Sequence, residues 1–189
     1  MLNVIVGISA LVNFALSGIV LLKGRDRFLS GVFSLFAASV GFWCCAAFFF
    51  WVSNEPLFWG RLMFVGPILM APAFLEFSLI FSNSVKGLSW KRFFVICAPG
   101  IFFLCLVPTS VIVKEIIYPS REVVYGIGNA LFGGYFNLYF FLAFIFLIIG
   151  WKKARGYKRS QFRYLFAGIF LSSVIGIATN LILPLLGTS

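Results

Sequence analysis

The stretch Trp151-Lys-Lys-Ala-Arg-Gly-Tyr-Lys-Arg-Ser-Gln-Phe-Arg163, followed by an apolar segment that ends in Asn180-Leu-Ile-Leu-Pro184, decides how the chain is organised. Apolar segments long enough to cross a bilayer lie on both sides of it. Such a cationic loop is expected to fix which way a membrane protein faces. The stretch holds six of the fifteen basic residues and no acid: Lys152, Lys153, Arg155, Lys158, Arg159 and Arg163.

The composition excludes an ordinary soluble domain. The 189 residues are 62% hydrophobic and 11% charged, whereas soluble domains are about half apolar and about a quarter charged. These values are typical of a protein that crosses the membrane several times. The net charge of +10 is explained by cationic loops at the membrane, so the bilayer, and not nucleic acid, is the expected partner.

Residues suited to enzyme or metal chemistry are scarce in this sequence. There is no histidine, which excludes a phosphoacceptor histidine and a histidine base within the chain. The four cysteines fall in apolar segments without a CxxC pair, as expected for small packing residues. We therefore expect no catalytic residue, no metal site and no cofactor.

Six segments have the length and composition of membrane-crossing helices, each of which needs about 20 apolar residues. The fourth is short and contains Pro99-Gly100. The sequence thus predicts an all-α bundle of six transmembrane helices that forms one domain over residues 1–189. The expected helices cover approximately residues 2–22, 28–52, 62–81, 93–107, 130–150 and 164–186.

The charges of the connecting loops predict the orientation of the bundle. The first, third and fifth loops hold twelve basic residues and one acid, whereas the other two hold three of each. Basic loops stay in the cytoplasm, so we expect a bacterial inner-membrane protein with its N-terminus outside. In the long loop that follows Pro108, β-branched runs flank Pro119-Ser120, which favours a small extracellular hairpin within residues 111–125 over an irregular interfacial loop.

Glu76 is the one acidic residue deep within a predicted helix. At about 1.5 Å per residue, it lies about 9 Å from the cytoplasmic end. An intramembrane carboxylate is a candidate for ligand binding or signalling because its burial is costly. The alternative is a structural role, in which Glu76 reaches the inner headgroups or pairs with a cation such as Arg163.

Four further residues are candidates for hinges or polar contacts. Pro67 and Pro72 lie in the same predicted helix and remove two backbone donors, which gives either a hinge or a static bend. Asn13 and Asn180 lie among small residues, whose usual role is to let helices pack closely. These two asparagines are the members best able to line a polar cavity.

Several short motifs run along the chain: Asn13…Gly18-Ile-Val-Leu-Leu-Lys-Gly-Arg25, Phe58-Trp-Gly-Arg-Leu62, Glu76-Phe-Ser-Leu-Ile-Phe81 and Gly156…Arg159-Ser-Gln-Phe-Arg-Tyr-Leu-Phe-Ala-Gly168. Together with Asn180-Leu-Ile-Leu-Pro184, they resemble the N-terminal seven-transmembrane region of bacterial sensor histidine kinases. The resemblance covers nearly the whole chain. It implies a membrane input module with its N-terminus outside, which is usually joined to cytoplasmic PAS, histidine kinase or diguanylate cyclase domains.

The resemblance also implies what to expect beyond the six helices. The family's seventh helix and its output domains are absent from this sequence, so we expect an input module that is truncated before its output. It would respond to a small molecule or a membrane-derived signal and act through a homodimer or a partner signalling protein. The alternative function is a small transporter or permease subunit with Glu76 as an ion or proton relay, although transporters usually carry matching polar features in two halves.

Overall fold

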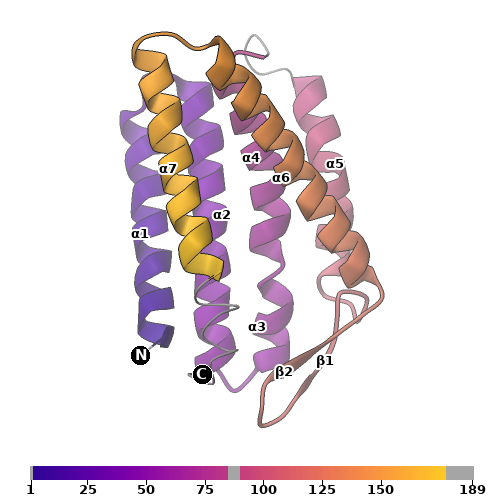
Figure 1. Cartoon of the computed structure of the whole chain (residues 1–189). Coiled ribbons are helices and arrows are strands. Elements are labelled where there is room, and N and C mark those ends of the chain that lie inside the picture. The colour runs from indigo at the N-terminus through magenta and orange to yellow at the C-terminus, as the bar shows by residue number, and fades with distance from the viewer. Residues whose placement is uncertain (1, 85–89, 178–189) are drawn as a thin grey trace.

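The computed structural model describes residues 2–84 and 90–177 of the chain. This part is all-α apart from one short hairpin (Figure 1). The helices are α1 (Leu2–Lys23), α2 (Arg27–Val52), α3 (Pro56–Leu62), α4 (Val65–Phe81), α5 (Trp90–Leu106), α6 (Gly128–Lys153) and α7 (Tyr157–Ile177). The strands are β1 (Val113–Ile117) and β2 (Glu122–Tyr125).

The helix α4 is the centre of the bundle. It packs against α2, α5 and α6, while α1 packs against α2 on the outside. The side chains of α4 are buried along most of its length, whereas α1 exposes apolar side chains such as Leu11 and Leu22. A helix with so much exposed apolar surface fits a lipid environment. The hairpin β1–β2 lies at one end of the bundle and the α6–α7 connection at the other (Figure 1).

Four helical segments of the described chain are long and apolar enough to cross a membrane. The predicted all-α membrane bundle is therefore confirmed in its class. The helix α5 has 17 residues, which span about 26 Å at 1.5 Å per residue, and α7 begins with two polar turns, so the full set of six crossings stays a prediction. The four segments are Asn3–Lys23, Arg27–Val52, Pro56–Phe81 and Gly128–Lys153.

The third candidate crossing, Pro56–Phe81, departs from the predicted helix over residues 62–81. It begins at Pro56 and is broken at Met63 and Phe64 into α3 and α4. Pro67 explains the break, because it has no N–H for the carbonyl of Met63 and its ring would collide with that carbonyl. Pro67 itself lies in the first turn of α4, where no intrahelical N–H is needed. Of the two predicted interior prolines, only Pro72 is inside the helix.

The basic stretch is mostly helical, and the prediction of a long fifth loop was wrong. The helix α6 continues to Lys153, and α7 begins at Tyr157, seven residues before its predicted start. Only residues 154–156 connect them, with Gly156 at φ +56°, a conformation that glycine adopts without strain. Lys152 and Lys153 fall in the last turn of α6, where cations interact favourably with the helix dipole.

Small residues bring α1 and α2 together. Ser17 and Ser34 each donate a hydroxyl hydrogen bond to the other's backbone carbonyl, at 2.8 and 2.9 Å. A Cβ atom at Gly41 would lie 3.2 Å from the carbonyl oxygen of Ala10. These contacts are the close helix approach that small residues allow in membranes.

The two strands pair in antiparallel fashion within the range in which the sequence favours a hairpin. Val123 faces Ile116 across the ladder, and Glu122 faces Ile117. The pairing is irregular between Val113 and Glu115. The chain then enters α6 through Gly126, whose N–H bonds to the carbonyl of Ile112 at 2.9 Å.

Candidate functional site

Glu76 forms a buried ion pair with Arg92. The Glu76 side chain is fully buried, and its Oε1 accepts from Arg92 Nη2 at 2.5 Å. Arg92 Nε lies 3.2 and 3.3 Å from Oε1 and Oε2, so both oxygens of the Glu76 carboxylate accept from the guanidinium group. The predicted pairing with a cation is thus present, but the cation is Arg92 of α5 and not Arg163 of α7. The pair joins α4 to α5.

This ion pair is sensitive to the loss of either partner. Removing two charges from water costs about as much as their attraction returns, so the net contribution of a buried pair is small. Removing one partner instead leaves an uncompensated buried charge, which is strongly destabilising. Glu76 therefore holds α4 and α5 in one relative position as long as Arg92 stays beside it.

Tyr135 replaces the hydrogen bond that Pro72 removes from α4. Because Pro72 lacks an N–H, the carbonyl of Ile68 four residues earlier has no helical donor. The Tyr135 hydroxyl of α6 donates to this carbonyl oxygen at 3.0 Å, and its side chain is buried. Gly100 of α5 makes room for the contact, because a Cβ there would lie 3.0 Å from the hydroxyl.

Tyr139, one turn further along α6, also donates its hydroxyl to a backbone carbonyl of a facing helix. Its hydroxyl donates to the carbonyl oxygen of Ile96 at 2.7 Å, in the turn of α5 that Pro99 interrupts. The rings of Tyr135 and Tyr139 lie 4.6 Å apart between their centroids. The helix α6 is thus bonded to α4 by one tyrosine and to α5 by the next. We call Glu76, Arg92, Tyr135 and Tyr139 the polar track.

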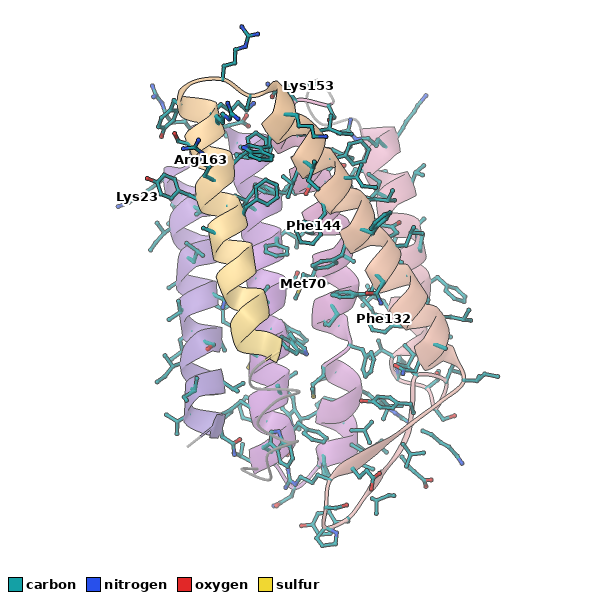
Figure 2. All side chains as sticks on the ribbon, in the orientation of Figure 1. Lys23, Met70, Phe132, Phe144, Lys153 and Arg163 are labelled. Atoms are coloured by element: carbon teal, nitrogen blue, oxygen red, sulfur yellow. The ribbon has the colours of Figure 1, made fainter. Side chains whose placement is uncertain are left out.

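Asn13 lines an apolar cavity of about 630 Å³ between α1, α2, α4, α6 and α7. Its amide nitrogen donates to the carbonyl of Ser9 at 2.8 Å, within its own helix. Most of the other lining side chains are aromatic, among them Phe144, which Figure 2 shows pointing into the bundle from α6. Asn180, the other predicted polar residue, lies outside the described residues.

The cations of the predicted basic loops gather at one end of the bundle. Lys23, Lys153 and Arg163 lie at this end in Figure 2, which we call the basic end. The acid of this region, Asp26, accepts from the N–H groups of Phe28 and Leu29 at 3.0 and 3.1 Å and caps α2.

Two cations of the basic stretch also contact the body of the bundle. Arg159 lies over the ring of Trp151, 6.0 Å from its centroid, which is within the range of a cation–π contact. Partial burial lowers the pKa of Lys158, because it disfavours the charged ammonium. The remaining members of the predicted set, Lys152 and Arg155, are exposed.

At the opposite end, two arginines hold the hairpin against the helices. Arg121 of the β1–β2 turn donates to the carbonyls of Phe50 and Ser53, where α2 ends. Arg61 of α3 donates to the carbonyl oxygen of Pro108 at 2.8 Å and to that of Val113 at 3.3 Å. Both guanidinium groups thus satisfy carbonyls where a helix ends, where a positive charge is favourable.

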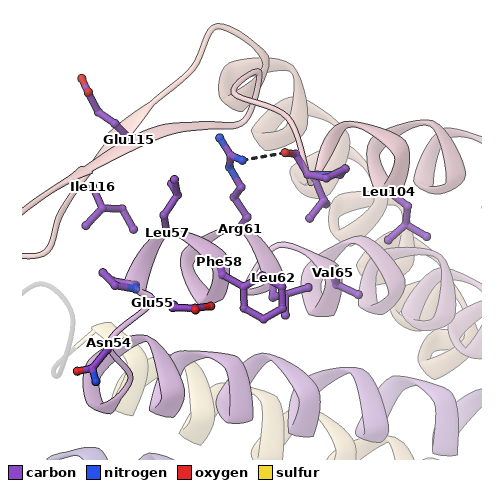
Figure 3. Close-up of a pocket in the computed structure, with 13 residues that line it drawn as sticks. Asn54, Glu55, Leu57, Phe58, Arg61, Leu62, Val65, Leu104, Glu115 and Ile116 are labelled. Atoms are coloured by element: carbon purple, nitrogen blue, oxygen red, sulfur yellow. Dashed lines mark hydrogen bonds between the residues drawn. The ribbon is translucent and has the colours of Figure 1, made fainter.

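A cavity of about 810 Å³ lies beside Arg61, between α3, the end of α5 and β1 (Figure 3). Its wall is aliphatic and aromatic, and two carboxylates, Glu55 and Glu115, belong to its lining. Among residues 2–84 and 90–177, no three His, Cys, Asp or Glu side chains lie close enough together to hold a metal ion. We take this cavity and the polar track as candidate functional sites.

Sequence reasoning missed the partners of the candidate residues. The predicted fourth helix begins at residue 93, which leaves Arg92 in the loop before it, and the sequence does not distinguish Tyr135 and Tyr139 from the many other aromatic residues. The available signal was chemical: a proline inside a buried helix frees a carbonyl, and a donor on a facing helix must satisfy it. Tyr135 meets this requirement, because it bonds to the Ile68 carbonyl that Pro72 leaves without a donor.

Comparison with known proteins identifies the family of the chain. The family described as the N-terminal 7TM region of histidine kinase matches residues 5–188. No curated protein and no solved structure matches the chain. Since the match spans nearly the whole sequence, the chain belongs to the N-terminal 7TM region family of histidine kinases.

Proposed function

We propose that the chain is the membrane-embedded, non-catalytic sensory input module of a histidine-kinase-type receptor. It detects a small molecule or a membrane-derived signal and passes a change of helix position to a cytoplasmic output domain. The family match supports the sensory role. The observation that carries the mechanism is the third crossing, because it contacts the hairpin at one end and bears Glu76 near the other.

The proposed orientation places the N-terminus and the hairpin outside and the basic end in the cytoplasm of a bacterial inner membrane. The distribution of basic residues over alternate loops supports it. So does the gathering of Lys23, Lys153 and Arg163 at one end of the bundle (Figure 2). In this orientation six helices cross the membrane, with α3 and α4 together as the third crossing.

The proposed path of the signal follows packed contacts along this crossing. The helix α3 lies directly on the hairpin, because a Cβ at Gly60 would come within 2.8 Å of the Ile116 side chain. The break at Met63 and Phe64 separates α3 from α4, and Glu76 of α4 is bonded to Arg92 of α5. A ligand at the hairpin end shifts the helices only if it binds two arrangements with different affinities. The polar track is the element whose arrangement would change.

The arrangement favours this function over a transporter in which Glu76 relays protons or ions. A relay needs a carboxylate that can exchange its proton or ion with water along a path. The Glu76 carboxylate is fully buried and bonded to Arg92. This geometry suits a contact that couples the positions of α4 and α5.

A chimeric receptor tests the sensory role. Residues 5–188 would replace the matching segment of a histidine kinase of this family, and a reporter gene under its response regulator would be measured. We expect kinase-dependent output that shifts at least about threefold in Glu76→Gln. Neutralising the carboxylate removes the ionic part of the α4–α5 bond, and coupling energies in allosteric proteins are about 1–3 kcal/mol.

The matched control for this chimera is Glu122→Gln, an exposed acid of β2 that lies outside the polar track. Its output should equal that of the unmodified chimera. Immunoblots of membrane fractions would verify equal insertion of all three proteins. A well-inserted chimera whose output is the same with and without Glu76→Gln would contradict the proposed role of the ion pair in signalling.

A further inference from the structure

The cavity at the hairpin end has the shape of a site for an amphiphile. Its floor is formed by apolar side chains of α3, of the start of α4 and of the end of α5, including Leu62, Val65 and Leu104 (Figure 3). At its edge the Phe58 and Leu57 side chains are 52% and 37% exposed, so the apolar wall is open to the surroundings. Because α3 begins the candidate spanning segment Pro56–Phe81, the opening lies where that segment enters the bilayer.

Charged groups of both signs line the same cavity. The Glu55 side chain makes no capping bond to α3 and is exposed, and Glu115 projects from β1 with only a distant contact to Lys114 at 4.0 Å. The Arg61 guanidinium uses Nε and Nη1 on the two carbonyls described above. Its Nη2 has no bonded partner among the described residues, so it can still donate to a ligand.

We infer that this cavity binds a phospholipid whose zwitterionic headgroup carries a phosphate and an ammonium. The acyl chain would lie along the apolar wall of α3 and α5. The phosphate would accept from Arg61, and the ammonium would pair with an exposed carboxylate at the rim of the cavity, Glu55 or Glu115. The inference deepens the proposed sensory function, because it names the chemical class of the membrane-derived signal, and it rests on the orientation proposed above.

The charge pattern distinguishes this ligand from purely anionic and purely cationic lipids. An anionic headgroup without an amine would meet Arg61 but would be repelled by two carboxylates. A purely cationic headgroup would meet the carboxylates but would leave the guanidinium edge unused. Only a headgroup with both charges complements both sides of the cavity. Purely anionic lipids are expected instead at the basic end, where cations predominate.

Lipid retention by the full chain tests the inference. The purified chain in detergent would be mixed with phosphatidylethanolamine and phosphatidylglycerol of identical acyl chains, and the bound lipid would be measured by native mass spectrometry. In the double variant Glu55→Gln/Glu115→Gln, we expect phosphatidylethanolamine retention to fall about fivefold, as the loss of two partly exposed ion pairs predicts. Leu104→Trp, which fills the apolar groove, should have at least the same effect.

Phosphatidylglycerol serves as the internal control, because its retention at the basic end should not change in either variant. Glu122→Gln, on the same hairpin but outside the cavity, should bind both lipids as the unmodified chain does. The inference is overturned if either cavity variant retains phosphatidylethanolamine like the unmodified chain, or if retention of both lipids falls equally. Because binding is measured on the purified chain, it is independent of the chimera's output, and failure of one proposal is distinguishable from failure of the other.

Discussion

Replacing Arg92 by methionine while Glu76 is kept will lower the free energy of unfolding of the chain by about 3 kcal/mol. The reason is that the fully buried Glu76 carboxylate would lose its partner and its charge-assisted hydrogen bonds. We expect the lower end of the range for broken buried pairs because the Arg92 side chain is 23% exposed. The measurement is equilibrium unfolding of the full chain in detergent micelles.

Two further variants give this prediction its controls. Lys91→Met removes an exposed cation from the neighbouring position and should leave stability unchanged within about 0.5 kcal/mol. The double variant Glu76→Leu/Arg92→Met should recover most of the loss, because it leaves no buried charge without a partner. If the double variant is as unstable as Arg92→Met alone, the buried charge is not the cause.

Tyr135→Phe will lower the free energy of unfolding by about 1–3 kcal/mol, the cost of an unsatisfied buried carbonyl. The carbonyl in question belongs to Ile68, which Pro72 leaves without a helical donor. The effect should largely disappear in a Pro72→Ala background, because an alanine at this position would supply the missing N–H within α4. Unfolding of the four proteins of this double-mutant cycle measures the coupling directly.

Tyr164→Phe is the matched control for that cycle, since Tyr164 is 79% exposed and its substitution should have little effect on stability. An equal loss on Tyr135→Phe in the presence and absence of Pro72 would show that the hydroxyl does not act through the freed carbonyl. In that case the hydroxyl would stabilise the chain in some other way, because phenylalanine keeps the ring contacts with Phe103 and Tyr139.

The class of the fold could be predicted from composition and hydropathy because membrane helices require long apolar segments. The helix ends could not, because apolar character alone does not mark where α3 breaks or where α7 begins. The break is explained by the position of Pro67 in the first turn of α4, and this position depends on where α4 begins. The early start of α7 reflects helical turns that extend into the basic stretch, where a hydropathy window finds no signal.

The candidate site could be predicted in part. Glu76 stood out because a buried carboxylate is costly anywhere in a membrane, and the structure places it in an ion pair. Its partner could not be chosen from the sequence, because several cations end at the same level of the bundle. Arg92 is the partner because α5 begins at Trp90 and brings position 92 beside Glu76 of α4.

The two arginines at the hairpin end explain an apparent exception to the charge pattern. Arg61 and Arg121 lie in predicted loops that are otherwise poor in basic residues. Each donates to backbone carbonyls near the end of a helix, so each has a structural role at the hairpin end. The positive-inside rule counts every basic residue in a loop, whether or not it has a structural role. Without these two arginines, Lys114 is the remaining basic residue of the two predicted loops.

The orientation of the bundle is the central claim, because both the signal path and the lipid site depend on it. It can be measured by labelling single cysteines, introduced in a background with Cys44, Cys45, Cys97 and Cys105 replaced by alanine, with a membrane-impermeant maleimide in intact spheroplasts. We predict that Ser120→Cys in the hairpin turn is labelled in intact cells, and that Arg155→Cys between α6 and α7 is labelled only after lysis. The reverse pattern, or labelling of both positions in intact cells, would contradict the account.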